Sequence, residues 1–206
     1  MTTPEAAGRE IIFVDDYGRG PALVAKIRAD SYAGQHGLSK ITFTADGIDL
    51  PDRWGLTRGW QKAYDSLNLP YRTVGSLPHT IQITPERINA VEAIVCFYPE
   101  DYKYIRDLAL RIPGGSNEDS PNKVFLLNDL AERIRLPKQS AEQVSPPKGR
   151  FRIIETLSSK WQSWKAWMHL KSEHEIKKEQ ILEIDQEVKT FVEHLSQAGR
   201  DWILPS

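Results

Sequence analysis

Short apolar runs separated by turn residues recur along the first two thirds of the chain. Continuous apolar or β-branched runs occupy residues 10–14, 40–44, 93–97 and 123–127. Runs of this length predict strands that are buried on both faces of a parallel sheet.

Helical patterns lie between these runs. Apolar residues recur at helical spacing after Pro21, in 58–67 and in 101–110. Thr84 followed by Pro85 predicts a capped helix start, because proline is favoured at the first helical position. Strands that alternate with helices predict right-handed crossovers. The fold class expected is therefore α/β, with a mainly parallel four-stranded sheet flanked by helices.

The last third of the chain has a different pattern. Residues 137–149 contain three prolines and no apolar periodicity. Helical stripes then predict one helix over 151–170 and a second over 173–197. The organisation expected is a flexible N-terminus (1–9), an α/β domain (10–136), a linker or excursion (137–149) and a C-terminal helical extension (150–206).

Composition narrows the classes of protein. The 206 residues carry 27 Lys and Arg against 28 Asp and Glu, a net charge of −1, which gives no support for nonspecific nucleic-acid binding. No apolar run approaches the length that spans a bilayer, and residues 1–8 lack the pattern of a secretory signal. We therefore expect a cytoplasmic protein without membrane association. The single cysteine, Cys96, excludes an internal disulfide and predicts a core residue within its strand.

Four segments carry a family resemblance. The first strand enters a loop that ends in Arg19, Gly20 and Pro21, and the second ends in the run Thr-Ala-Asp-Gly at 44–47. The helix and strand of 83–97 and the strand of 123–127 follow in the same order. Over residues 10–137 the chain resembles the low-molecular-weight protein tyrosine phosphatases and their arsenate reductase relatives.

Two residues that this family needs for catalysis are missing. The family uses a cysteine, five intervening residues and an arginine, but counting back six positions from Arg19 gives Phe13. The family also has an aspartic acid before a proline, where this chain has Leu136 before Pro137; Asp129 lies close by as a substitute if the loop runs differently. The resemblance therefore implies a catalytically inactive phosphatase-like protein that acts as a protein-interaction or regulatory module.

The loop after the first strand contains the candidate binding residues. Gly18, Arg19 and Gly20 lie before a predicted helix, where free amides favour an anion. Arg19 could instead neutralise Asp15 or Asp16, and these two acids could hold a metal ion. No cofactor is expected under the leading hypothesis.

Two alternative functions remain open. Asp15 and Asp16, with Asp46, could bind Mg²⁺ or Mn²⁺ in a metal-dependent phosphoryl or nucleotidyl enzyme. The chain could also bind a nucleotide or phospho-ligand at the carboxyl end of its sheet, the usual ligand site of open α/β folds.

Three tryptophans characterise the C-terminal extension. Trp161, Trp164 and Trp167 occur together with lysines. Helical spacing explains Trp161 and Trp164 as core residues, and an interface is the other interpretation. The leading hypothesis predicts a protein partner or self-association through the C-terminal helices.

Overall fold

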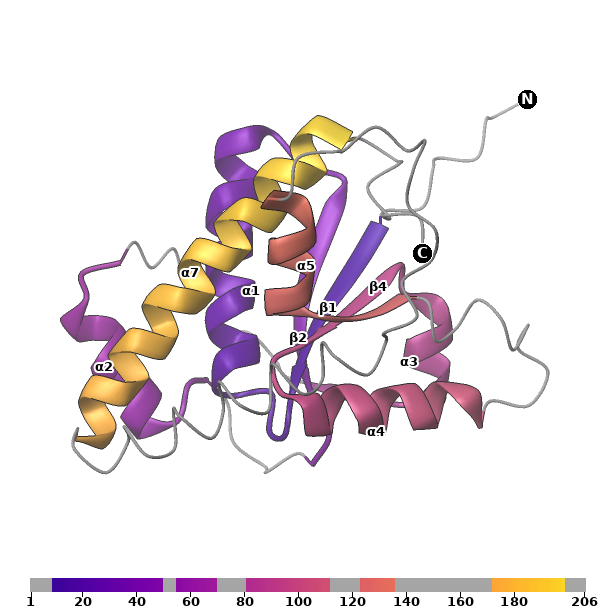
Figure 1. Ribbon diagram of the computed structural model, residues 1–206, viewed down its shortest axis with the longest axis horizontal. Helices are drawn as coiled ribbons and strands as arrows, with labels where there is room; N and C mark the ends of the chain where they lie inside the picture. Colours follow the sequence, from indigo (N-terminus) through magenta and orange to yellow (C-terminus); the bar gives the residue numbers. More distant parts are fainter. Residues whose placement is uncertain (1–8, 50–54, 70–80, 112–122, 136–171, 199–206) are drawn as a thin grey trace, which may run out of the picture.

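A parallel sheet organises the protein. The computed structural model describes residues 9–49, 55–69, 81–111, 123–135 and 172–198 (Figure 1). All pairings in the five-stranded sheet are parallel, and the strand order is β3-β2-β1-β4-β5. The strands are β1 (Arg9–Asp15), β2 (Ile41–Gly47), β3 (Ile81–Gln82), β4 (Ala93–Cys96) and β5 (Val124–Leu126).

Helices cover both faces of this sheet. They are α1 (Pro21–His36), α2 (Arg58–Ser66), α3 (Pro85–Ala90), α4 (Pro99–Leu110), α5 (Leu127–Arg135) and α7 (Glu173–Ala198). Figure 1 shows α1, α5 and α7 on one side of the strands and α3 and α4 on the other.

Alternate residues of β1 point to these two layers. Ile11 and Phe13 join a core with α1, α2, α5 and α7, while Ile12 and Val14 join a second core with α3 and α4. All four side chains are fully buried. The continuous apolar run in the sequence therefore reflects a strand with apolar neighbours on both faces.

The long C-terminal helix α7 confirms the helix predicted over 173–197. Its stripe includes Ile184, Val188 and Phe191, all buried in the core shared with α1. Arg28 of α1 also forms an ion pair with Asp185 of α7. The apolar stripe of α7 thus contributes to the main core of the α/β fold.

The observed elements differ from the predicted ones in two places. The sheet has a fifth strand, β3, whose two exposed residues are too short a segment to give an apolar pattern. Helix α5 follows β5 directly, at a position where no helix was predicted. The expectations for Trp161, Trp164, Trp167, the helix at 151–170 and the linker at 137–149 fall outside the described residues.

None of the helices in the described ranges is both long enough and apolar enough to cross a membrane.

Candidate functional site

The carboxyl ends of β1 and β4 meet at one edge of the sheet. Parallel pairing places Val14 beside Cys96, so the loop after β1 lies next to the segment that opens α4. The loop at 16–20 then leads into α1, whose first residue is Pro21. In Figure 1 this edge is at the bottom of the view, where α4 begins.

Asp15 is at the centre of the loop and accepts four backbone hydrogen bonds. Its Oδ1 accepts from the amides of Tyr17 (2.9 Å) and Gly18, and its Oδ2 accepts from those of Gly20 (3.2 Å) and Ala22 (2.9 Å). The carboxyl group is only 4% exposed. Burial raises the pKa of Asp15, and the four amide donors oppose that shift because they stabilise the charged form. The loop therefore encloses a carboxyl group that belongs to the chain itself.

Glycines allow the loop to close around this carboxylate. Gly18 has a φ of 62°, in the left-handed region that favours glycine. A Cβ on Gly47 of β2 would lie 2.7 Å from the carbonyl carbon of Tyr17, so the loop crosses directly over that glycine. A Cβ on Gly20 would lie 3.0 Å from Nε1 of Trp60 and 3.4 Å from Oδ2 of Asp15. These contacts leave the loop little freedom to widen.

The residues predicted to bind an anion, Gly18, Arg19 and Gly20, all form hydrogen bonds within the chain. The amides of Gly18 and Gly20 donate to the carboxyl oxygens of Asp15. The Nε of Arg19 donates to the carbonyl oxygen of Gly55, at 2.7 Å. An external anion at these three residues stays a prediction.

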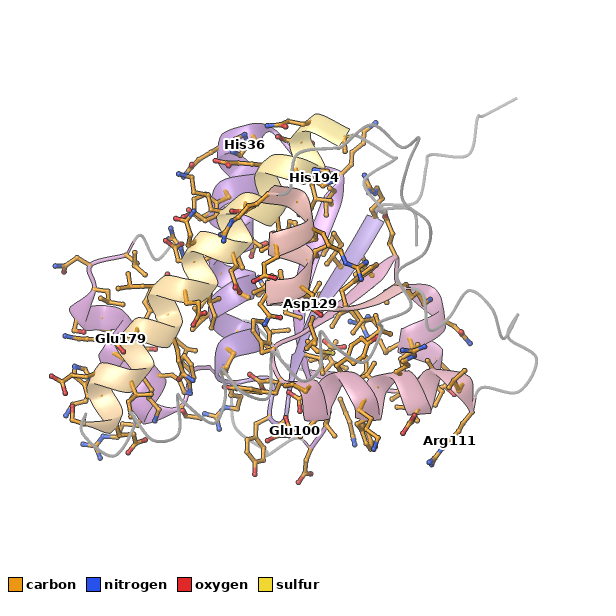
Figure 2. The ribbon with its side chains drawn as sticks, in the orientation of Figure 1. His36, Glu100, Arg111, Asp129, Glu179 and His194 are labelled. Atoms are coloured by element: carbon orange, nitrogen blue, oxygen red, sulfur yellow. The ribbon has the colours of Figure 1, made fainter. Side chains whose placement is uncertain are left out.

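The residues considered for thiol and acid chemistry are not in this loop. Phe13, six positions before Arg19, is fully buried in β1 and stacks on Phe43 with ring centroids 6.1 Å apart. Cys96 is fully buried in β4, as predicted, and burial raises the pKa of its thiol well above the ordinary value. Asp129 lies in the first turn of α5 (Figure 2), and burial raises its pKa.

Asp46 does not join Asp15, although the sequence placed the two together. Asp46 pairs with Val14 in the parallel register, and therefore points to the α3 side of the sheet, opposite to Asp15. It accepts a hydrogen bond from Nε of Arg87 at 3.1 Å, and Arg87 also binds Glu10. Burial raises the pKa of Asp46 to about 6, even though Arg87 lowers it. The charge partner of Asp46 in this structure is therefore Arg87, on the face of the sheet opposite to Asp15.

Another acid, Asp101, completes the site instead. It lies in the first turn of α4, is 3% exposed, and lies close enough to the exposed Asp16 for the two carboxyl groups to interact electrostatically. Burial and the nearby charges of Asp16 and Asp15 raise its pKa to about 7. Burial raises the pKa of Tyr98, and the nearby charges of the same acids raise it further.

The sequence analysis missed Asp101 and Tyr98. The available signal was Pro99, which begins a helix directly after a buried strand and so places the next residues at a sheet edge. Their position beside Asp16 depends on β4 pairing with β1, which no local pattern specifies.

The described residues contain no group of three or more histidine, cysteine, aspartate or glutamate side chains arranged to hold a metal ion. Both oxygens of Asp15 accept amide hydrogen bonds, and Asp16 lies near Asp101. A metal bound by Asp15 and Asp16 stays a prediction.

No protein-family model matches the chain, and no curated protein sequence does. Solved structures of low-molecular-weight phosphatases do match. A low-molecular-weight phosphotyrosine phosphatase from Vibrio cholerae has a TM-score of 0.62 at 14% identity, over 93% of this chain and 99% of that one. A low-molecular-weight protein tyrosine phosphatase from Bacillus subtilis has a TM-score of 0.58 at 16% identity, over 91% of this chain and 97% of that one.

An arginine phosphatase, YwlE from Geobacillus stearothermophilus, has a TM-score of 0.58 at 11% identity, over 94% of this chain and 96% of that one. At these identities the similarity shows the fold alone. The chain therefore has the α/β fold of the low-molecular-weight phosphatases.

Proposed function

We propose that this chain is a catalytically inactive protein on the low-molecular-weight phosphatase fold, and that it acts as a protein-interaction or regulatory module. The observation that carries this proposal is the Asp15 side chain, whose carboxyl oxygens occupy the amide donors of the loop.

The filled loop argues against phosphate binding. A phosphate dianion needs free amide donors, and Asp15 holds four of them. The tethered carboxylate competes at a high effective concentration because it cannot diffuse away. Asp16 and Asp101 add like charge beside the loop, which disfavours a second anion.

The thiol supports the same conclusion. A cysteine nucleophile must be deprotonated and accessible. Cys96 is fully buried, and its raised pKa keeps the thiol protonated. Its β-strand position places it in the core with Ile94, away from solvent.

A hydrolysis assay tests the proposal. The wild-type chain and the Cys96→Ser variant are assayed with an aryl phosphate, with and without Mg²⁺ or Mn²⁺, beside a phosphatase of the same fold as a positive control. We expect turnover at the buffer rate for both proteins.

Two outcomes would overturn inactivity. Robust hydrolysis that disappears in Cys96→Ser would restore thiol chemistry. Hydrolysis that requires a divalent ion and disappears in Asp16→Asn would support the metal-dependent alternative instead.

A further inference from the structure

Three acidic residues lie at the sheet edge, beside the loop that the Asp15 side chain occupies. We call Asp16, Glu100 and Asp101 the acidic mouth. Asp16 directly follows β1, while Glu100 and Asp101 occupy the first turn of α4. Since β1 and β4 are parallel neighbours, their carboxyl ends bring these segments together. Figure 2 shows Glu100 at the start of α4, below the strands.

An unpartnered atom lies within the mouth. Oδ2 of Asp101 is buried and has no hydrogen-bond partner among the described residues. A buried polar atom without a partner loses solvation that nothing replaces. The other two acids, Asp16 and Glu100, are exposed. The acidic mouth therefore contains two exposed carboxylates, those of Asp16 and Glu100. It also contains one buried carboxyl oxygen, Oδ2 of Asp101, that could still accept a hydrogen bond.

The charges that face Asp101 come from each neighbouring segment. Asp15 and Asp16 act from the loop after β1, and Glu100 acts from α4 itself. Tyr98, which directly precedes α4, lies near the same acids. All of the acids raise the pKa of Asp101, so the environment favours an added positive charge.

Two exposed tyrosines occur on the segments that form the mouth. Tyr17 follows Asp16 and is 52% exposed, and Tyr104 follows Glu100 by one helical turn and is 50% exposed. An aromatic face attracts a cation through its quadrupole. Carboxylates beside exposed tyrosines are complementary to a basic side chain.

We propose that the acidic mouth binds a lysine or arginine side chain from a basic peptide segment of a partner protein. Ammonium and guanidinium groups donate strong hydrogen bonds to carboxylates. Asp16 and Glu100 form the outer contacts, and Asp101 supports them from behind. The proposal rests on the interaction role proposed above, and names the chemistry of the partner.

Binding is linked to protonation of Asp101. With a pKa of about 7, Asp101 is largely protonated in mildly acidic solution. A bound cation stabilises the ionised form, so binding releases a proton there. Affinity therefore rises with pH until Asp101 is ionised in the free protein.

Calorimetric titration with three matched peptides tests the proposal. The peptides differ at one central position, which is arginine, lysine or the neutral isostere citrulline. We expect the two basic peptides to bind and the citrulline peptide not to bind. Free arginine amide is a fourth ligand, and equal affinity for it would show that a small cation rather than a peptide is recognised, which would overturn the peptide assignment.

Variants locate the site. Asp16→Asn and Glu100→Gln should each weaken binding, by about tenfold for Asp16. Asp101→Asn should remove the rise in affinity with pH. Asp65→Asn, an exposed acid on α2, is the matched control and should bind as the wild type does.

The inference fails if citrulline and arginine peptides bind equally, if Asp65→Asn weakens binding as much as Asp16→Asn, or if neither basic peptide binds. Since Asp16 and Glu100 are exposed, their variants remain informative even if Asp101→Asn does not fold. Because hydrolysis is measured separately, absent peptide binding by an inactive protein would refute this inference and leave the inactivity proposal standing.

Discussion

At the level of single side chains, Asp15 combines two structural roles. It ends β1, and its carboxylate also satisfies the amides of Gly20 and Ala22 at the start of α1. The first amides of a helix have no partner within the helix. Gly20, the N-cap residue of α1, supplies no side-chain cap. Asp15 therefore caps α1 from the preceding strand.

Replacement of Asp15 with alanine should lower the free energy of unfolding. The change leaves buried amide donors without an acceptor, and we expect a loss of about 2–4 kcal/mol. Urea unfolding measures the effect. The control is Asp16→Asn, which changes the adjacent exposed acid and should alter stability by less than about 0.5 kcal/mol. Equal stability of Asp15→Ala and the wild type would contradict the capping role.

The roles of individual acids were the least predictable part of the site. The sequence indicated that Asp15 and Asp16 lie at a strand end, which is correct. The sequence could not show that the Asp15 side chain accepts hydrogen bonds from the loop that follows it. An aspartate that binds a metal ion and one that accepts backbone amides are the same residue in the sequence. The role of Asp101 depends on contacts with a segment about 85 residues earlier in the chain, a separation that local patterns do not encode.

At the level of elements, the end of β2 supports the loop after β1. The amides of Ile48 and Asp49 donate to the carbonyl oxygens of Asp15 and Asp16, at 3.2 and 2.7 Å. Gly47 lets the backbone of Tyr17 approach closely, as its missing side chain leaves the necessary space. The loop is therefore held by both its own glycines and the neighbouring strand.

Two glycine substitutions should have opposite effects. Gly47→Ala should destabilise the protein by about 1–3 kcal/mol, because its Cβ would meet backbone atoms that cannot move aside easily. Gly34→Ala, in α1, has no atom within 4 Å of the added Cβ and should stabilise the protein by about 0.5–1 kcal/mol. Thermal unfolding of the pair measures both effects. A stable Gly47→Ala variant would show that the loop can shift.

Most elements could be predicted because their signals are local. The apolar runs identified β1 and β4, and Thr84 with Pro85 identified the start of α3, where Thr84 accepts a hydrogen bond from the amide of Arg87. The short strand β3 gave no signal, since an edge strand of two exposed residues needs no apolar run. Helix α5 was missed because its first apolar residue, Leu127, continues the pattern of the strand before it.

At the scale of the whole molecule, buried acids influence stability. Burial raises the pKa of Asp46 to about 6, and burial with neighbouring acids raises those of Asp101 and Glu187 to about 7. Each acid therefore has a lower pKa in the unfolded state than in the folded state. At a pH between these two values, the folded state keeps a proton that the unfolded state has released. Stability therefore falls as pH rises through that interval.

The free energy of unfolding should therefore decrease from about pH 4 to about pH 7. Asp101 contributes because its pKa rises from 3.8 to about 7 on folding. We expect about 1–2 kcal/mol from this residue, after allowance for solvent screening. Denaturant unfolding across the pH range measures the slope. Asp101→Asn should flatten it, and an unchanged slope would assign the effect to other acids.

The loop between β1 and α1 limits how thiol chemistry could be introduced into this chain. A cysteine at position 15 would place its sulfur among amides that now close on a carboxylate, and Gly47 and Trp60 bound the space on either side. A phosphate group is larger than a carboxyl group, so the backbone amides of the loop would have to lie further apart to bind it. A longer loop with Asp15 retained would loosen the cap on α1 before any activity appeared. Substitution and insertion would therefore have to occur together, so a cysteine nucleophile in this loop requires two coupled changes, each of which alone costs stability.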